Sequence, residues 1–133
     1  MFPVSASTLR RVLWLDAASG IGMGLSHLVL AEPLSDWTGI PAAWLQLAAV
    51  VVFGAASLAA WLSRRASPPA GGVRFLAAGN FAWVAASLWL AFGAGLPLTA
   101  LGLGWVLMQA AVVLVLAELE WAGSRQVRGL IAA

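Results

Sequence analysis

The chain has 133 residues, of which 62% are hydrophobic and only 9% are charged, and its formal net charge is +2. A soluble domain carries roughly 25% charged residues, so this chain has too few charges to cover a water-exposed surface. Its basic residues are seven arginines without any lysine, and they lie at the ends of apolar segments, which argues against nucleic acid as a partner. The absence of cysteine excludes disulfides, thiolate metal sites and cysteine nucleophiles.

Four apolar segments fill most of the chain, and each has about the 20 residues needed to cross ~30 Å of hydrocarbon. A backbone in lipid must satisfy its own hydrogen bonds, so these segments are predicted to be helices. The predicted spans are 12–31, 41–62, 73–92 and 98–118. Short connections that contain proline or glycine make successive helices antiparallel neighbours. The sequence therefore predicts an all-α membrane fold, an up-down four-transmembrane-helix bundle that forms one domain over residues 1–133.

The first segment also resembles a cleavable signal peptide, because Arg10 and Arg11 precede an apolar stretch that ends in Val29-Leu30-Ala31, which resembles a cleavage site. Asp16 and His27 interrupt that stretch, and neither is typical of the apolar region of a signal. The segment is therefore predicted to remain as the first span.

The arginines predict the orientation of the bundle. They precede the first span, flank the second loop and follow the fourth span, at Arg10, Arg11, Arg64, Arg65, Arg74, Arg125 and Arg128. The first and third loops hold no arginine, and the first loop carries Glu32 and Asp36. Positive residues favour the cytoplasmic side, so both termini are predicted to lie in the cytoplasm. Arginine without lysine, with abundant alanine, glycine and leucine, indicates a GC-rich bacterial genome and hence the bacterial inner membrane.

An offset of 64 residues relates several uncommon residues of the two halves. It pairs Arg10 with Arg74, Asp16 with Asn80, Pro33 with Pro97 and Arg64 with Arg128. One interpretation is a duplicated helical hairpin, with the halves related by an axis along the membrane normal. The alternative is chance, because matches arise easily in a sequence of low complexity.

Asp16 is the most informative single residue, because an acidic residue inside a span is costly and usually faces the bundle interior. It is either a proton or cation site or a structural carboxylate bonded to Asn80, Ser19 or an arginine. Since Asp16 and Asn80 share the 64-residue offset, they are expected at equal depth and close enough for a direct or water-mediated hydrogen bond.

His27 lies eleven residues after Asp16, close to three helical turns, so both residues share a face with Gly20. This face is predicted to turn into the bundle rather than toward lipid. His27 is expected near the outer end of the span, bonded to Glu32, Gln46 or water. The alternative is a haem ligand, for which a symmetric dimer would have to supply a second histidine.

The third and fourth spans carry further polar side chains. Asn80, Trp83 and Ser87 share one helical face by their spacing, and Gln109 lies near the middle of the fourth span. Buried amides commonly form hydrogen bonds between helices, and the alternative is a ligand-facing pocket.

Two acidic residues close the fourth span. Glu118 either reaches toward the level of Asp16 or lies at the cytoplasmic interface, and Glu120 is expected to be solvated. The candidate intramembrane polar site therefore comprises Asp16, His27, Asn80, Ser87, Gln109 and Glu118. No catalytic residue, metal or cofactor is predicted.

Three short motifs resemble those of small, uncharacterised four-transmembrane-helix proteins of the bacterial inner membrane. They are Leu15-Asp16-Ala17 in the first span, Asn80 with Trp83 in the third, and Ala117-Glu118-Leu119 at the end of the fourth. The resemblance covers nearly the whole chain. That family has no assigned activity, so the resemblance implies a fold and a location only.

The leading hypothesis for function is a non-enzymatic accessory subunit or small oligomer. Its partner would be a second copy or another membrane protein, bound in the lipid bilayer through small-residue faces at Gly20/Gly24 or Gly102/Gly104.

The alternative hypothesis is a small transporter, or a binder of lipid, quinone or another small molecule, that uses a polar interior formed by Asp16, Asn80 and Gln109. Small multidrug carriers have a similar size and a buried acid in the first span, but here the acid lies near the cytoplasmic end. A membrane enzyme or haem protein is a third hypothesis, opposed by the single histidine and by the absence of a carboxylate pair in register.

Overall fold

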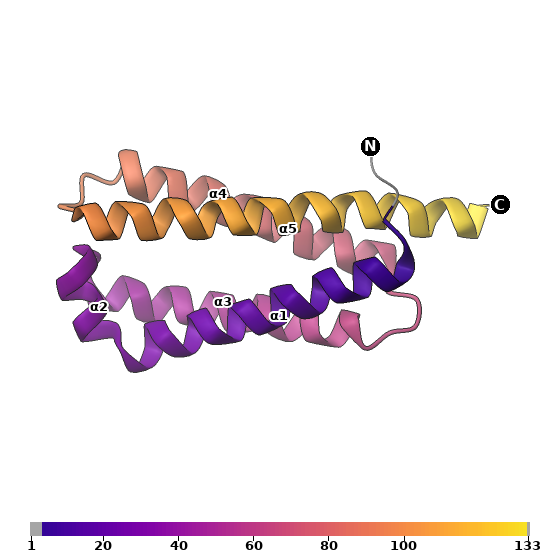
Figure 1. Ribbon diagram of the computed structural model, residues 1–133, viewed down its shortest axis with the longest axis horizontal. Helices are drawn as coiled ribbons and strands as arrows, with labels where there is room; N and C mark the ends of the chain where they lie inside the picture. Colours follow the sequence, from indigo (N-terminus) through magenta and orange to yellow (C-terminus); the bar gives the residue numbers. More distant parts are fainter. Residues whose placement is uncertain (1–3, 133) are drawn as a thin grey trace.

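The computed structural model describes the backbone of residues 4–132 and the side chains of residues 4–126, which leaves the side chain of Arg128 outside the described set. Within that backbone there are helices and turns but no strand. The five helices are α1 (Ala6–Val29), α2 (Ala31–Thr38), α3 (Ala42–Ser63), α4 (Ala70–Phe92) and α5 (Ala100–Ala132) (Figure 1). All except α2 are long and apolar enough to cross a membrane. The four predicted spans are thus all helical, and the fold holds one helix more than predicted.

The additional helix, α2, occupies the loop predicted between the first two spans. The backbone at Leu30 departs from helical geometry (φ −109°) and separates α2 from α1. Pro33 stands in the first turn of α2, where a missing N–H is harmless, and Glu32 in the same turn suits the positive end of the helix dipole. Gly39 ends α2 in the left-handed conformation (φ +78°). Proline and glycine, which predicted a loop, here belong to the two ends of a short helix.

Two predicted boundaries differ from the structure by more than three residues. The first helix begins at Ala6 rather than at residue 12, because the Ser5 hydroxyl accepts a hydrogen bond from the Thr8 amide at 3.1 Å and caps it. The last helix continues from the predicted end at Glu118 to Ala132. Acidic residues interrupt the apolar pattern there, but glutamate is a good helix former, so the helix continues beyond the apolar segment.

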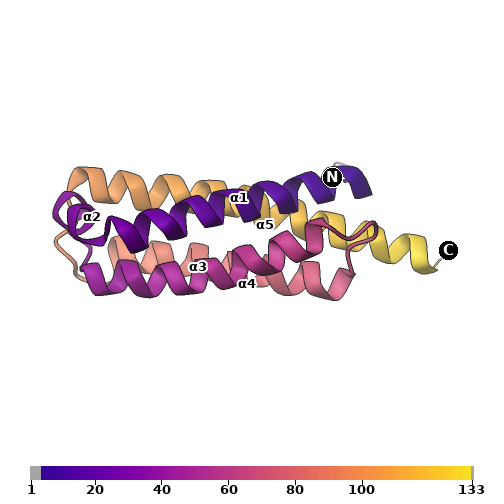
Figure 2. The ribbon, with the colours of Figure 1, turned by 90° about the horizontal axis from the view of Figure 1, so that it is seen from below.

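The helices form two antiparallel hairpins. α1 packs along α3, and α4 packs along α5, whereas α1 touches α5 less and α3 touches α4 least. α1 and α4 have no close backbone approach and lie diagonally across the bundle. Figures 1 and 2 show the four long helices side by side with both termini at the same end. This is the predicted up-down arrangement, and it is built from two helical hairpins.

Small residues hold α1 close to α3. A Cβ atom placed on Gly20 would lie 3.0 Å from the Ala56 Cβ, and one placed on Gly24 would lie 2.9 Å from the Phe53 ring. The Gly20/Gly24 face is therefore occupied within the chain. Gly102 is likewise covered, by the Thr38 backbone of α2.

The two ends of the bundle differ in chemistry. At the end with the termini, the Arg10 guanidinium donates to the Ser63 carbonyl oxygen (3.2 Å), and Arg74 donates to the Ser124 hydroxyl (3.3 Å). A fully buried apolar cluster that includes Leu9, Leu13, Leu62 and Val73 packs this end tightly. At the other end, α2 lies across the bundle, and Thr99 at the start of α5 donates its amide to the Thr38 carbonyl (3.1 Å).

Candidate functional site

Asn80 joins two carboxylates from different helices. Its Nδ2 donates to Asp16 Oδ2 of α1 and to Glu120 Oε2 of α5, each at 3.1 Å. All three residues are buried, with exposed fractions of 7% for Asn80, 8% for Asp16 and 0% for Glu120. The predicted hydrogen bond between Asp16 and Asn80 is confirmed, and it spans the diagonal of the bundle. We call Asp16, Asn80 and Glu120 the carboxylate cluster.

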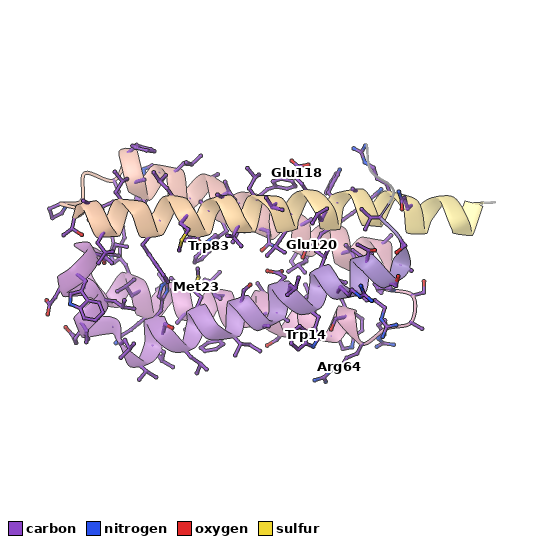
Figure 3. All side chains as sticks on the ribbon, in the orientation of Figure 1. Trp14, Met23, Arg64, Trp83, Glu118 and Glu120 are labelled. Carbon is purple, nitrogen blue, oxygen red and sulfur yellow. The ribbon has the colours of Figure 1, made fainter. Side chains whose placement is uncertain are left out.

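The place of Glu120 in this cluster corrects the prediction that it is solvated. Glu118 is the exposed acid instead, and Figure 3 shows these two side chains leaving α5 on opposite sides. The buried residues Val106, Ala110, Ala117, Glu120 and Ser124 recur at helical spacing along α5. This stripe was the missed signal, because it becomes visible only when the helix is continued past residue 118. The cluster also provides the carboxylate pair that the sequence did not reveal.

In the carboxylate cluster, two acidic side chains accept hydrogen bonds from one neutral amide nitrogen. Since both carboxylate oxygens lie 3.1 Å from one nitrogen, they are at most about 6 Å apart, and two negative charges at that separation repel. The second oxygen of Glu120, Oε1, is buried without a hydrogen-bond partner among the described residues. A proton or a cation held between the two carboxylates would remove the repulsion.

Gln109 ties α5 to α4. Its Oε1 accepts a hydrogen bond from the Trp83 indole (2.7 Å), and its Nε2 donates to the Ser87 hydroxyl (2.9 Å) and to the Val106 carbonyl (2.9 Å). Ser87 is itself buried and donates to the Trp83 carbonyl. The predicted shared face of Asn80, Trp83 and Ser87 is present, and the structure supports the interpretation of Gln109 as a bond between helices.

His27 is buried, with an exposed fraction of 4%, so the predicted inward face of the first span is confirmed. Two of its three expected partners are wrong, because Glu32 and Gln46 are exposed and neither ring nitrogen has a partner within the described part of the chain. A hydrogen bond to water stays a prediction. The nearest described aromatic ring is that of Trp105, with a centroid distance of 6.4 Å.

Two adjoining cavities lie between the hairpins. The Asp16 cavity, about 380 Å³, is lined by Asp16 and Asn80 together with Met23 and other apolar residues. The His27 cavity, about 260 Å³, is lined by His27 and mainly by aromatic and aliphatic side chains. Both include Val51, Trp83, Trp105 and Gln109 in their walls, so these residues separate them. Figure 3 shows Met23 and Trp83 directed into the space between the hairpins.

Five of the six predicted site residues lie in the interior of the bundle, where they form two groups. The sixth, Glu118, is exposed. Asp16 and Asn80 belong to the carboxylate cluster, whereas Ser87, Gln109 and His27 line the other cavity. Among the described residues, no group of three or more His, Asp or Glu side chains is placed to hold a metal ion.

Comparisons of the chain with known protein families, with curated proteins and with solved structures found no match. Its function must therefore be inferred from the site itself.

Proposed function

We propose that this protein is a multi-pass protein of the bacterial inner membrane that binds a small lipophilic molecule between its two helical hairpins. Four long apolar helices support the membrane location. The described arginines at one end of the bundle, with Glu32 and Asp36 at the other, support cytoplasmic termini.

The observation that carries the proposal is the pair of adjoining cavities. Cavities of about 380 and 260 Å³, both open to the outer surface, lie between hairpins that are each closely packed within themselves. Ligand sites typically measure roughly 300–1,000 Å³ and combine apolar walls with a few polar groups, which is the composition of both cavities.

The accessory-subunit hypothesis has lost its principal support. It depended on small-residue faces, and Gly20, Gly24 and Gly102 all pack within the chain. Gly104 alone of these residues meets no atom within 4 Å. Association with another chain is therefore a weaker proposal than binding of a small molecule.

Mass spectrometry of the protein released from lipid nanodiscs tests the proposal. We expect the wild-type chain, purified from its own membrane, to retain a small molecule at close to one per chain. At least one of two variants should reduce that occupancy fivefold or more: Met23→Trp, whose larger side chain fills the Asp16 cavity, or Ala48→Trp, whose larger side chain fills the His27 cavity. Leu25→Trp is the matched control, since Leu25 lies two residues away on the same helix but is half exposed and outside both cavities. A wild-type chain without bound molecules, or occupancy that neither cavity variant lowers below that of Leu25→Trp, contradicts the proposal.

A further inference from the structure

We propose that the His27 cavity binds the oxygen-bearing ring of a neutral, membrane-soluble compound of the phenol or quinone class, with the oxygen hydrogen-bonded to the His27 imidazole. This inference rests on the proposed function, because it assigns a ligand class and a recognition residue to one of the two cavities.

The first observation is the unpartnered imidazole. A neutral imidazole carries one donor and one acceptor, and buried polar groups nearly always find partners. His27 is 4% exposed and neither nitrogen has a partner among the side chains described. Gln109 cannot supply one by donation, because both amide hydrogens are engaged by Ser87 and the Val106 carbonyl. The unmet hydrogen bonds of His27 therefore lie at the wall of a cavity.

The second observation is the character of the walls. Four tryptophans line the cavity, at Trp44, Trp83, Trp89 and Trp105, and the rings of Trp44 and Trp89 stack on each other with their centroids 6.2 Å apart. Aromatic ligand rings pack well against tryptophan side chains. The described lining includes no charged side chain, so a charged ligand would lack a counter-charge. The ligand is therefore planar and neutral.

The third observation is the size. A cavity of about 150 Å³ holds a benzene molecule, and drug-sized ligands need roughly 300 Å³ or more. At about 260 Å³, the His27 cavity accommodates one six-membered ring with small substituents.

The fourth observation is the opening of the cavity. Several lining residues are exposed on the apolar outer surface, namely Trp44, Leu47 and Val51 on α3 and Trp89 on α4. These two helices have the least contact of the neighbouring long pairs, so the opening lies between them. A ligand that enters there arrives from the hydrocarbon phase, which selects for a lipophilic compound. A ring oxygen is then the simplest group that is neutral, small and able to bond with an imidazole.

Two isosteric probes test the assignment. Para-cresol and para-xylene differ only by a hydroxyl in place of a methyl group. Their binding is measured by equilibrium dialysis of wild-type protein in nanodiscs, with empty nanodiscs to correct for partition into lipid. We expect para-cresol to bind at least tenfold more tightly than para-xylene, because only the hydroxyl pairs with His27. Equal affinity overturns the inference, and this comparison needs no variant.

Variants of His27 then locate the contact. His27→Phe should remove the preference for para-cresol and leave para-xylene affinity within twofold, whereas His27→Gln should retain part of the preference. A preference that persists in His27→Phe overturns the assignment of His27. A third probe, 2-methyl-1,4-benzoquinone, distinguishes the two oxygen chemistries, and the absence of cysteine removes its usual side reaction with thiols. Tighter binding than para-cresol identifies a carbonyl ligand, and weaker binding identifies a hydroxyl ligand.

The inference and the proposed function fail in different ways. If neither ring binds but the wild-type chain retains a small molecule that Met23→Trp or Ala48→Trp displaces, the ligand class is wrong and the cavity proposal stands. If neither ring binds and no molecule is retained, both are wrong.

Discussion

Asn80 is the residue on which the polar interior of this bundle depends. It is the described donor to both Asp16 and Glu120, and it stands on a helix that has no close backbone approach to α1. One amide therefore connects three helices. An amide suits this position because its two hydrogens serve two acceptors without adding a charge.

Truncation of the Asp16 side chain should lower the free energy of unfolding more than its replacement by a neutral amide does. We expect Asp16→Ala to destabilise the protein by about 1–2 kcal/mol, because it takes a buried partner from Asn80. Asp16→Asn should cost less, because it keeps a hydrogen-bonding group and ends the repulsion with Glu120. Reversible unfolding in mixed micelles measures both changes.

Glu120 gives a complementary prediction with a built-in control. Glu120→Gln is expected to be neutral or stabilising, whereas Glu120→Ala should cost about 1–2 kcal/mol because the site is fully buried. Glu118→Ala on the exposed side of the same helix should stay within about 0.5 kcal/mol of wild type. Equal effects at residues 118 and 120 in the same unfolding assay would contradict the buried cluster.

Gln109 should act as a structural bond rather than as a ligand contact. Gln109→Leu removes the described bonds to Trp83 and Ser87, and each hydrogen bond between membrane helices contributes about 0.6 kcal/mol on average. We therefore expect a loss of about 1 kcal/mol in the free energy of unfolding. Gln46→Leu is the control, since Gln46 is exposed and should tolerate the change. No loss for Gln109→Leu would argue against the bond.

The sequence predicted some of the residue contacts in the site and not others. The pairing of Asp16 with Asn80 followed from a shared offset and depth, and the structure contains it. The burial of Glu120 was not predicted, because the apolar pattern ends at residue 118 whereas the helix continues beyond it. The unpartnered state of His27 could not be predicted, because it depends on distances between helices that sequence spacing does not define.

At the scale of the helices, glycine position determines how closely α1 and α3 approach. Gly20 and Gly22 differ by two residues on one helix, yet Gly20 faces Ala56 and Gly22 meets no atom within 4 Å. The small-residue face at Gly20/Gly24 predicted close helix packing correctly, and α3 of the same chain packs against it. The sequence did not identify this partner, because any helix with a small-residue face would fit.

A glycine-to-leucine substitution should therefore affect stability differently at residues 20 and 22. Gly20→Leu should push α1 away from α3 and cost about 1–3 kcal/mol by overpacking. Gly22→Leu should be neutral or slightly stabilising, because the space is open and leucine favours the helix over glycine. Thermal unfolding of the two variants in the same detergent checks the expectation, and a similar loss in both would contradict the described α1–α3 contact.

At the scale of the whole molecule, the two hairpins share more than their connectivity. In each, an arginine of the first helix bonds to a serine in the second: Arg10 to Ser63, and Arg74 to Ser124. Arg10 and Arg74 are related by the same offset as Asp16 and Asn80. The two acceptors are not equivalent, because Arg10 bonds to a backbone carbonyl and Arg74 to a hydroxyl, and the 64-residue offset does not relate Ser63 to Ser124. Duplication of the hairpin therefore stays a prediction. The cavities lie between the hairpins because packing is close within each of them.

The orientation of the bundle yields the last prediction, and the absence of cysteine makes it direct to test. Asp36→Cys places a thiol on exposed α2, and Ser67→Cys places one in the exposed α3–α4 turn, at opposite ends of the bundle. Because arginine-rich loops stay in the cytoplasm, a membrane-impermeant maleimide should label Asp36→Cys in cells whose outer membrane admits it. Ser67→Cys should react only after the inner membrane is permeabilised. The reverse pattern would invert the topology, and labelling of both thiols before permeabilisation would mean that the apolar helices do not separate the two ends across a membrane.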